Sequence, residues 1–222
     1  MGREAIDSMP GQAPGRAAIA SAVVSYFEWH GEPGYWRDLT RHFDPDAKLL
    51  DIGCGTAWLG RHFRDYAGID GSPEAVRLAS ERGLDVSLGD ASQPLPFEDS
   101  SFDAVVMKDL LEHVSDPVAT VNEARRVLRP GGRAFASSPD AQRWVWDDYT
   151  HRRPFTRTGF KRLFADQGLG VLSCGYESVM PGSSIIAART RDHRRPAPLR
   201  AAAWLPIVRR NVWILAERPA GS

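Results

Sequence analysis

The chain has 222 residues, enough for one domain with additional segments but not for two full domains. Hydrophobic residues make up 42% of it and charged residues 25%, proportions that are typical of a folded globular protein and that exclude disorder over most of its length. The 28 lysines and arginines balance the 28 aspartates and glutamates, so the chain lacks the general positive charge with which proteins attract nucleic acids. We therefore expect a single folded domain and no nucleic-acid partner.

Cysteine content and hydropathy predict the compartment. The two cysteines, Cys54 and Cys174, cannot form a framework of disulfide bridges, which fits a reducing cytoplasm. No apolar run approaches the roughly 18 residues that cross a bilayer, and the segment 1–16 lacks the apolar core of a signal peptide. We expect a cytoplasmic protein with no transmembrane segment and with a flexible tail over residues 1–16.

The order of the predicted elements indicates the fold class. Apolar residues at helical spacing over 17–29 and 35–43 predict a helical N-terminal preface. Short β runs and helices then alternate, which predicts an α/β fold with a doubly wound, largely parallel sheet. The expected strands are 48–52, 66–70, 85–88, 102–108, 133–137, 169–176 and 211–217, and the expected helices begin near 58, 73, 117 and 158.

Helix and strand boundaries carry their own signals. Ser72 and Asp116 each precede a proline, which is typical of a cap followed by the first helical residue. The sequence Pro130-Gly131-Gly132 is expected to end a helix before a strand begins.

A glycine turn between the first strand and the next helix is the most informative motif. In an open α/β sheet, ligands bind beyond the carboxyl ends of the strands, and this is the first crossover. Gly53 and Gly55 allow a ligand to approach the backbone, where free N–H groups can bind an anion, and Asp51 can accept hydrogen bonds from an amine or from turn amides. A plain strand-to-helix turn is the alternative interpretation.

The spacing around this turn argues against a dinucleotide site. The G-x-G-x-x-G fingerprint requires a third glycine where Trp58 stands. Asp70 ends the second predicted strand, where a carboxylate either binds both hydroxyls of a ribose or caps the helix that begins near Pro73. Asp90 follows the third strand, where it either accepts a hydrogen bond from an adenine amine or forms a surface turn. The fourth strand becomes polar at Lys108, at its cleft end.

Five motifs in this order resemble the class I S-adenosylmethionine-dependent methyltransferases, in particular the small-molecule branch that includes ubiquinone and menaquinone biosynthetic enzymes. They are Asp51-Ile-Gly-Cys-Gly-Thr56, Gly68-Ile-Asp70-Gly-Ser72, Gly89-Asp-Ala91, Leu111-Glu-His-Val114 and Val127-Leu-Arg-Pro-Gly-Gly132. The resemblance implies a Rossmann-like sheet of seven strands whose last strand is antiparallel. It also implies one domain over 17–222, with a preface at 17–46, a cofactor-binding core at 47–138 and acceptor-side elements at 139–222.

The same resemblance implies S-adenosylmethionine as cofactor and S-adenosylhomocysteine as product. By this analogy Asp51 and the backbone of Gly53 and Gly55 hold the methionine end, and Lys108 and its neighbours contact it through carbonyl groups. The ribose is expected at Asp70 and Gly71, and the adenine at Asp90 and Ala91. Trp58 departs from the family pattern, because a smaller residue commonly occupies that position.

Two histidines are the candidates for a catalytic base, because imidazole titrates near neutral pH and a hydroxyl acceptor must lose its proton. His113 follows the cleft end of the fourth strand, and His151 lies in an Asp-Asp-Tyr-Thr-His sequence similar to a segment that borders the acceptor pocket in bacterial relatives. His113 could instead cap the turn or line the pocket.

The segment around His151 also offers contacts for a substrate. Trp146 and Tyr149 are expected to pack on a substrate ring; alternatively this is a structural loop with Trp144 or Trp146 in the core and Thr156 capping the next helix. Asp147, Asp148 and His151 could bind a metal, but three ligands within five residues and no partner cluster lead us to expect none.

The connection 179–210 carries seven arginines and one aspartate around an apolar stretch. It could form a lid over a lipid-linked or anionic acceptor, contact a membrane surface, or be a solvated loop with one docked helix.

We expect methyl transfer to a small-molecule or glycan-type acceptor, at oxygen in preference to nitrogen or carbon. The alternatives are a short-chain reductase, disfavoured because no tyrosine precedes a lysine by four positions, and a non-catalytic S-adenosylmethionine-binding protein. A homodimer is left open.

Overall fold

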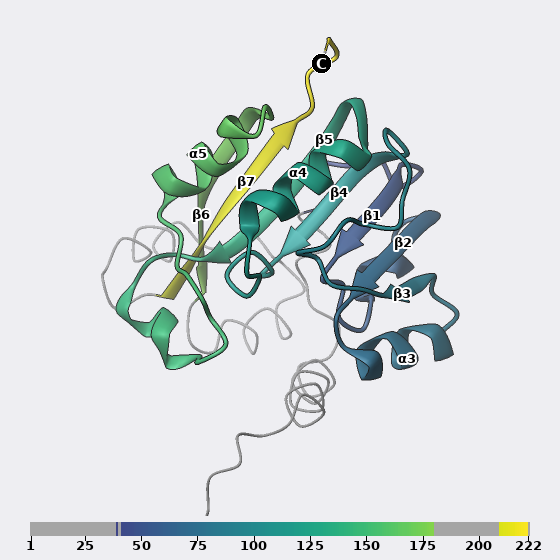
Figure 1. The fold of residues 1–222 in the computed structure, drawn as a ribbon, viewed down its shortest axis with the longest axis horizontal. Helices are drawn as coiled ribbons and strands as arrows, with labels where there is room; N and C mark the ends of the chain where they lie inside the picture. The colour runs from purple at the N-terminus through teal and green to yellow at the C-terminus, as the bar shows by residue number, and fades with distance from the viewer. Residues whose placement is uncertain (1–38, 40, 180–208, 222) are drawn as a thin grey trace, which may run out of the picture.

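The computed structural model describes residues 39, 41–179 and 209–221, and Figure 1 draws the rest as a thin grey trace. The tail 1–16, the helix expected over 17–29 and most of the one expected over 35–43 lie outside the described residues. So does nearly all of the connection 179–210.

Seven strands form one sheet, in the order β3-β2-β1-β4-β5-β7-β6. Strands β1 to β5 pair in parallel, whereas β7 is antiparallel to both of its neighbours. In Figure 1 the arrow of β7 points opposite to those of β1, β2 and β4. The expected sheet of seven strands with an antiparallel last strand is confirmed. The strands are β1 Lys48–Ile52, β2 Asp65–Asp70, β3 Val86–Leu88, β4 Phe102–Lys108, β5 Leu128–Pro139, β6 Gly170–Val179 and β7 Arg209–Glu217.

The helices begin where the sequence places caps. Ser72 caps α3 by accepting a hydrogen bond from Ala75 N at 3.2 Å, and Asp116 caps α4 by accepting from two backbone amides at 3.0 Å. Both helices begin with a proline. The helices in chain order are the 3-10 helix η1 Trp58–Arg61, α3 Pro73–Glu81, α4 Pro117–Val127, the 3-10 helix η2 Arg143–Asp147 and α5 Arg157–Asp166.

The first crossover is shorter than expected, because the helix predicted from about Trp58 is the single 3-10 turn η1. Gly60 allows this turn to pack directly on β2: a Cβ there would lie 2.9 Å from the ring of Tyr66. The close packing leaves residues 53–64 room for one turn between β1 and β2.

Strand β5 begins before the glycines that were expected to precede it. Leu128 pairs with Phe102, the register then shifts, and Arg133 pairs with Ala104. Gly131 adopts φ +79° within this irregularity, and its amide donates to Arg218 O at 2.8 Å. The glycines therefore form a bulge inside the strand, which explains why the helix ends at Val127 and the strand begins at once.

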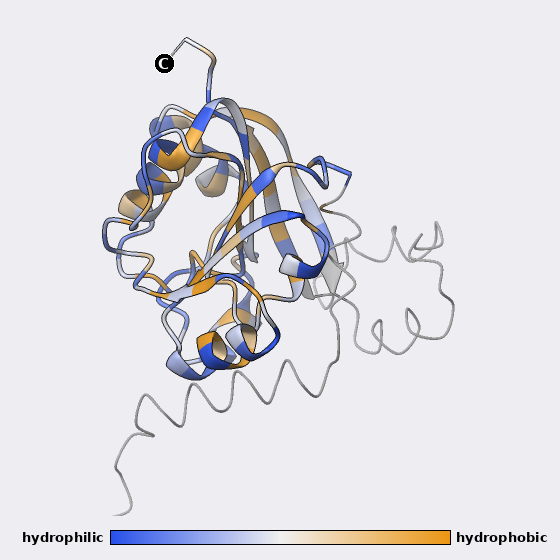
Figure 2. Ribbon diagram, turned by 90° about the vertical axis from the view of Figure 1, so that its right-hand side faces the viewer, coloured by the Kyte–Doolittle hydropathy of each residue, from blue (hydrophilic) through white to orange (hydrophobic). Residues whose placement is uncertain are grey.

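The sheet has an apolar core on each face. Alternate residues of β1 face opposite sides: Leu50 packs in the core under α4 and α5, and Leu49 packs in the core that contains Leu59 of η1 and Ala79 of α3. Figure 2 shows apolar residues along the central strands and in stripes on the helices, with hydrophilic residues on the outer turns. Helices on both faces leave the ends of the strands as the place for polar groups.

Candidate functional site

Four of the predicted site residues lie at the carboxyl ends of neighbouring parallel strands. Asp51 lies near the end of β1, Asp70 ends β2, Asp90 follows β3 and Lys108 ends β4. The amide of Gly89 donates to Asp70 O at 3.0 Å, which holds the segment after β3 against the end of β2. The topology therefore brings these residues to one edge of the sheet, as expected from the chain order.

The glycine turn after β1 is fixed by backbone conformation and contact. Gly53 and Gly55 adopt φ +75° and +54°, which residues with a side chain rarely adopt. The amides of Gly53 and Cys54 donate to Ile69 O at 2.8 and 3.2 Å and join the turn to β2. Ala57 adopts φ +57° in the same turn, which was not expected from the sequence, because alanine carries no signal for a left-handed conformation.

Asp51 is a buried carboxylate with 5% of its surface exposed. The hydroxyl of Tyr66 donates to its Oδ2 at 3.1 Å. Burial raises the pKa of Asp51 to about 7; the charge of Asp70 adds to this rise, while the Tyr66 bond and the charge of Lys108 oppose it. A positively charged group placed beside Asp51 would favour the ionised carboxylate.

Asp70 fastens the glycine turn to the start of α3. Its Oδ2 accepts from Gly55 N at 2.7 Å and its Oδ1 accepts from Ser72 N at 2.8 Å. Burial raises the pKa of Asp70, and these two amide bonds oppose the rise. The alternative that Asp70 caps α3 is wrong, because Ser72 provides the cap. Each carboxylate oxygen retains a second lone-pair direction for another donor.

The segment after β3 is held by its own turn and by α4. Asp90 is exposed, and its Oδ1 accepts from Ser92 N at 2.8 Å. The hydroxyl of Thr120 donates to Ala91 O at 3.0 Å. Gly71 lies in open surroundings, since a Cβ there would be 3.7 Å from the nearest other group. Asp90 therefore forms the surface turn through Oδ1, and its side chain is exposed to solvent.

The end of β4 is tied to β5 and β7 through Asp109. Asp109 forms an ion pair with Lys108, accepts from Ser137 Oγ at 2.9 Å and from Asn211 Nδ2 at 3.3 Å. Burial alone would raise the pKa of Asp109, but the charge of Lys108 and the hydrogen bonds from Lys108 and Ser137 hold it below its usual value. Asp109 also adopts φ +50°, so the chain turns sharply as it leaves the strand.

The turn after β4 and the loop after β5 bring three titratable side chains together. Glu112 and His113 come from the turn and His151 from the loop, and the rings of the two histidines lie 4.8 Å apart between centroids. Burial and the negative charge of Asp109 raise the pKa of Glu112 to about 8. Burial and the neighbouring His151 lower the pKa of His113. Both histidines are candidates on sequence grounds, whereas Glu112 is recognised only from the structure.

The loop after β5 exposes both predicted substrate-contacting residues. Trp146 is 57% exposed and Tyr149 is 73% exposed, whereas the neighbouring Val145 is fully buried. The interpretation that Trp146 lies in the core is therefore wrong, and Val145 anchors the loop instead. Thr156 caps α5 by accepting from Gly159 N at 3.1 Å, as the alternative interpretation expected.

Trp58 stands at the start of η1 and packs against two cations. The guanidinium groups of Arg61 and Arg82 lie 4.5 and 5.0 Å from its ring centroid. The indole of Trp58 therefore packs against these arginines, and the left-handed backbone conformation of the turn lies at the neighbouring Ala57.

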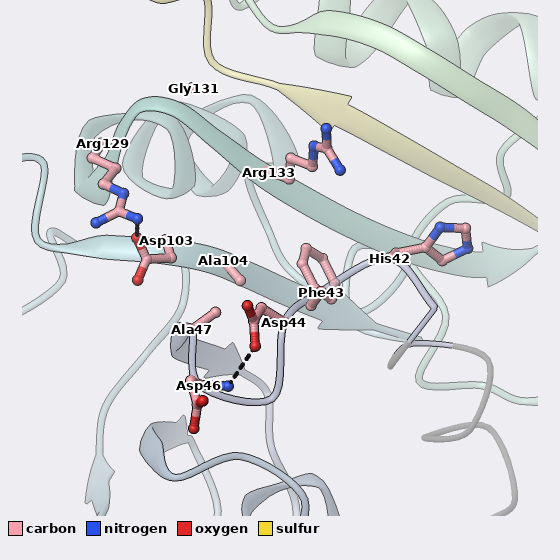
Figure 3. Close-up of a pocket in the computed structure, with 10 residues that line it drawn as sticks. All are labelled: His42, Phe43, Asp44, Asp46, Ala47, Asp103, Ala104, Arg129, Gly131 and Arg133. Carbon is pink, nitrogen blue, oxygen red and sulfur yellow. Dashed lines mark hydrogen bonds and ion pairs between the residues drawn. The ribbon is translucent and has the colours of Figure 1, made fainter.

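A cavity of about 290 Å³ lies at the opposite edge of the sheet. Figure 3 shows it between the segment 42–47 and the beginnings of β4 and β5, with an ion pair between Arg129 and Asp103 on its wall. Ligands of open parallel sheets bind outside the carboxyl ends of the strands, so this cavity is not the candidate site.

Residues 50–136 match the family described as a methyltransferase domain. This part of the chain is a class I S-adenosylmethionine-dependent methyltransferase domain. The chain is 40% identical over 118 residues to an uncharacterized 37.1 kDa protein in transposon TN4556 of Streptomyces fradiae, covering 48% of this chain and 32% of that protein. It is 36% identical over 102 residues to a ubiquinone biosynthesis O-methyltransferase of Xanthomonas oryzae pv. oryzae, covering 41% and 43% of the two.

Solved structures share the fold of the methyltransferase domain. The methyltransferase from the Haloferax volcanii complex with the activator Trm112 superimposes with a TM-score of 0.68 at 20% identity, over 94% of this chain and 100% of that one. A S-adenosylmethionine-dependent methyltransferase of Thermotoga maritima gives 0.67 at 20% identity, over 90% and 98%. These likenesses establish the fold.

The chain spans between 32% and 55% of the length of the first curated relatives that it matches. Within the described ranges, no helix is both long and apolar enough to cross a membrane.

Proposed function

We propose that the methyltransferase domain binds S-adenosylmethionine at the carboxyl ends of β1 to β4 and transfers its methyl group to a hydroxyl of a small-molecule or glycan-type acceptor. The observation that carries the proposal is the convergence of Asp51, Asp70 and the glycine turn at one edge of the sheet. The chemistry of these groups matches the parts of the cofactor in the order that the strands present them.

The cofactor-binding residues fit an amino acid joined to a nucleoside. The buried carboxylate of Asp51 suits the methionine ammonium, because that cation would restore the charge that burial suppresses. The backbone of Gly53 and Gly55 would contact the same end. Asp70 has lone pairs left for the ribose hydroxyls, although its two oxygens already hold the turn. Gly71 would lie beside it.

The segments after β3 and β4 would bind the adenine and the methionine portion of the cofactor. Asp90 and Ala91 would contact the adenine, since they follow β3 beside Asp70. The backbone at Lys108 would contact the methionine portion, because its ammonium is already paired with Asp109. When bound, the cofactor supplies a methyl carbon attached to a positively charged sulfur.

The acceptor would lie at the ends of β4 and β5. Trp146 and Tyr149 offer exposed aromatic side chains in the loop after β5, and the rings of His113 and His151 lie 4.8 Å apart between centroids. An imidazole of this pair, or solvent, would take the proton of the acceptor hydroxyl as the hydroxyl oxygen receives the methyl group, and S-adenosylhomocysteine would leave with the electron pair of the former S–C bond. Holding the reactants in line can contribute about 7–11 kcal/mol.

Production of S-adenosylhomocysteine tests the proposal. The purified chain is incubated with S-adenosylmethionine and a panel of hydroxylated sugars, phenols and lipid-linked alcohols, with amines and carbon acids as comparison. Methylation of hydroxyl compounds is expected. Transfer only to nitrogen or carbon would correct the acceptor atom, and tight cofactor binding with no turnover on any acceptor would favour a non-catalytic binding protein.

The two histidines are tested in the same assay. His113→Ala and His151→Ala should each lower kcat by about 100-fold or more while changing the Kd for S-adenosylhomocysteine less than threefold, because both side chains lie on the acceptor side. If both variants turn over at the wild-type rate, neither histidine acts on the acceptor.

A further inference from the structure

Glu112, His113 and His151 form a compact cluster of metal-ligating groups. One ligand atom from each of them lies within 4.8 Å of the other two. Glu112 and His113 are adjacent in the turn after β4, and His151 comes from the loop after β5. The amide of Arg152 donates to the backbone O of Glu112 at 2.7 Å, so the two segments are joined where the cluster forms.

The hydrogen bonds of both histidines leave the same ring nitrogen available. His151 Nδ1 lies 2.6 Å from Val145 O, and a carbonyl can only accept, so Nδ1 carries a proton and the neutral ring has its lone pair on Nε2. His113 Nδ1 lies 3.1 Å from the hydroxyl and 3.4 Å from the carbonyl of Thr150, which favours the same tautomer. Metal-binding histidines are commonly held in this way, with one nitrogen bonded to a backbone carbonyl and the other on the metal.

The burial of Glu112 is a second observation, independent of the histidines, that supports a cation at this cluster. Its side chain is fully buried, and among the described residues neither carboxylate oxygen forms a hydrogen bond of ordinary distance and angle, although the Ser138 hydroxyl lies near enough to lower the pKa of Glu112 slightly. A buried ionised carboxylate without a counter-charge is unfavourable by several kcal/mol, so such a group takes up a proton, pairs with a cation or binds a metal. A cation between Glu112 and the two imidazoles would supply the missing partner.

A second carboxylate borders the cluster. Asp148 Oδ2 lies 3.8 Å from His151 Nε2, too far for a hydrogen bond, while its other oxygen accepts from Thr150 N and Oγ1. A lone pair on Nε2 that faces a carboxylate would be unfavourable without a proton or a cation between them. Asp148 therefore adds negative charge at the side of the cluster where a cation would lie.

We propose that Glu112, His113 and His151 form a binding site for one divalent transition-metal ion. Two imidazoles and a carboxylate suit Zn²⁺, Mn²⁺, Fe²⁺ or Co²⁺ better than Mg²⁺ or Ca²⁺, which prefer oxygen ligands. Three protein ligands leave positions for an oxygen donor, so the site would take the hydroxyl or a neighbouring oxygen of the acceptor. Binding of the ion rests on these residues alone; its role toward the acceptor rests on the proposed function.

The sequence led to the opposite expectation for a spatial reason. Along the chain, the candidate ligands are Asp147, Asp148 and His151, and no second cluster of ligand residues lies near them in the sequence. The fold supplies the partners from the turn after β4, nearly forty residues upstream.

The test is a Co²⁺ titration of the full chain after dialysis against a chelator, followed by visible absorption, with Zn²⁺ as competitor and no cofactor present. We expect one ion per chain. His151→Ala should weaken binding by about 100-fold, and Glu112→Gln should weaken it by about tenfold or more. The matched control is His62→Ala, because His62 lies just before β2, at the opposite end of the sheet. Circular dichroism confirms folding, and the milder Glu112→Gln change keeps the test valid should His151→Ala unfold.

A wild-type chain that binds neither Co²⁺ nor Zn²⁺ would overturn the proposal, as would equal weakening by His62→Ala and His151→Ala. In the first case the histidines would be left as proton acceptors. Because the titration contains no cofactor, a chain that binds the ion but not S-adenosylmethionine would refute the proposed function and leave the metal site standing.

Discussion

Burial of Asp51 makes the charge of its carboxylate depend on what lies beside it. With a pKa of about 7 in the free protein, the side chain is protonated in mildly acidic solution and ionised above neutrality. The proposed ligand ammonium requires the ionised form. The residue thus links the affinity of the site to pH in a direction that can be measured.

The affinity for S-adenosylhomocysteine should rise with pH and then level off. Below pH 7 a proton must leave Asp51 before the ammonium pairs with it, so Kd should increase by up to about tenfold for each pH unit below 7 and stay constant above about 8. Calorimetry between pH 5.5 and 8.5 measures this. Asp51→Asn should bind weakly with a flat profile, and a flat wild-type profile would contradict the assignment.

Replacement of Asp70 tests the ribose contact. Asp70→Ala should weaken binding of S-adenosylhomocysteine by more than about tenfold, because it leaves the ribose hydroxyls without their acceptor and also releases Gly55 N. The matched control is Asp65→Ala, an exposed aspartate at the other end of the same strand. Unchanged affinity in Asp70→Ala, or an equal loss in Asp65→Ala, would refute the assignment.

Among elements, the glycine turn shows how backbone and packing combine at the candidate site. A Cβ on Gly53 would lie 2.8 Å from Leu110 Cδ1, in the turn that leads to Glu112 and His113. The turn after β1 therefore packs directly on the turn after β4. A side chain at position 53 should therefore disturb the packing of both turns.

Gly53→Ala should destabilise the fold more than Gly83→Ala. Both glycines have nearly the same φ, +75° and +77°, but nothing lies within 4 Å of a Cβ at Gly83. Gly83→Ala should therefore cost only the left-handed conformation, about 1 kcal/mol, and Gly53→Ala a further 1–3 kcal/mol from the contact with Leu110. Urea unfolding gives both values; equal losses would show that Leu110 moves aside freely.

Local patterns predicted most elements to within a residue or two, because alternation, caps and prolines are local signals. The caps at Ser72 and Asp116 are confirmed, and β4 has the expected bounds. The prediction of a longer helix from Trp58 was wrong, because the length of this element depends on how closely Gly60 packs on Tyr66, which is a tertiary contact. Glu112 was missed for the same reason: its burial against the loop after β5 has no signature in its neighbours along the chain.

At the scale of the whole molecule, the carboxyl ends of the strands hold two separate groups of polar residues. The carboxylates of β1 and β2 lie on one side of β4, and the cluster of Glu112, His113 and His151 lies toward β5. Asp109 joins these regions through Lys108 and Ser137. Cofactor and acceptor would therefore meet at the end of β4, where the in-line arrangement must be set.

The measurement that tests this account most directly is a calorimetric titration of the full chain with S-adenosylhomocysteine near pH 8, paired with thermal unfolding. One site per chain is predicted. Ligand at about 100 times Kd should stabilise the fold by about 2.7 kcal/mol and raise Tm by roughly 5–10 °C. A folded chain that gives no binding heat and no shift in Tm, even at millimolar ligand, would contradict the account.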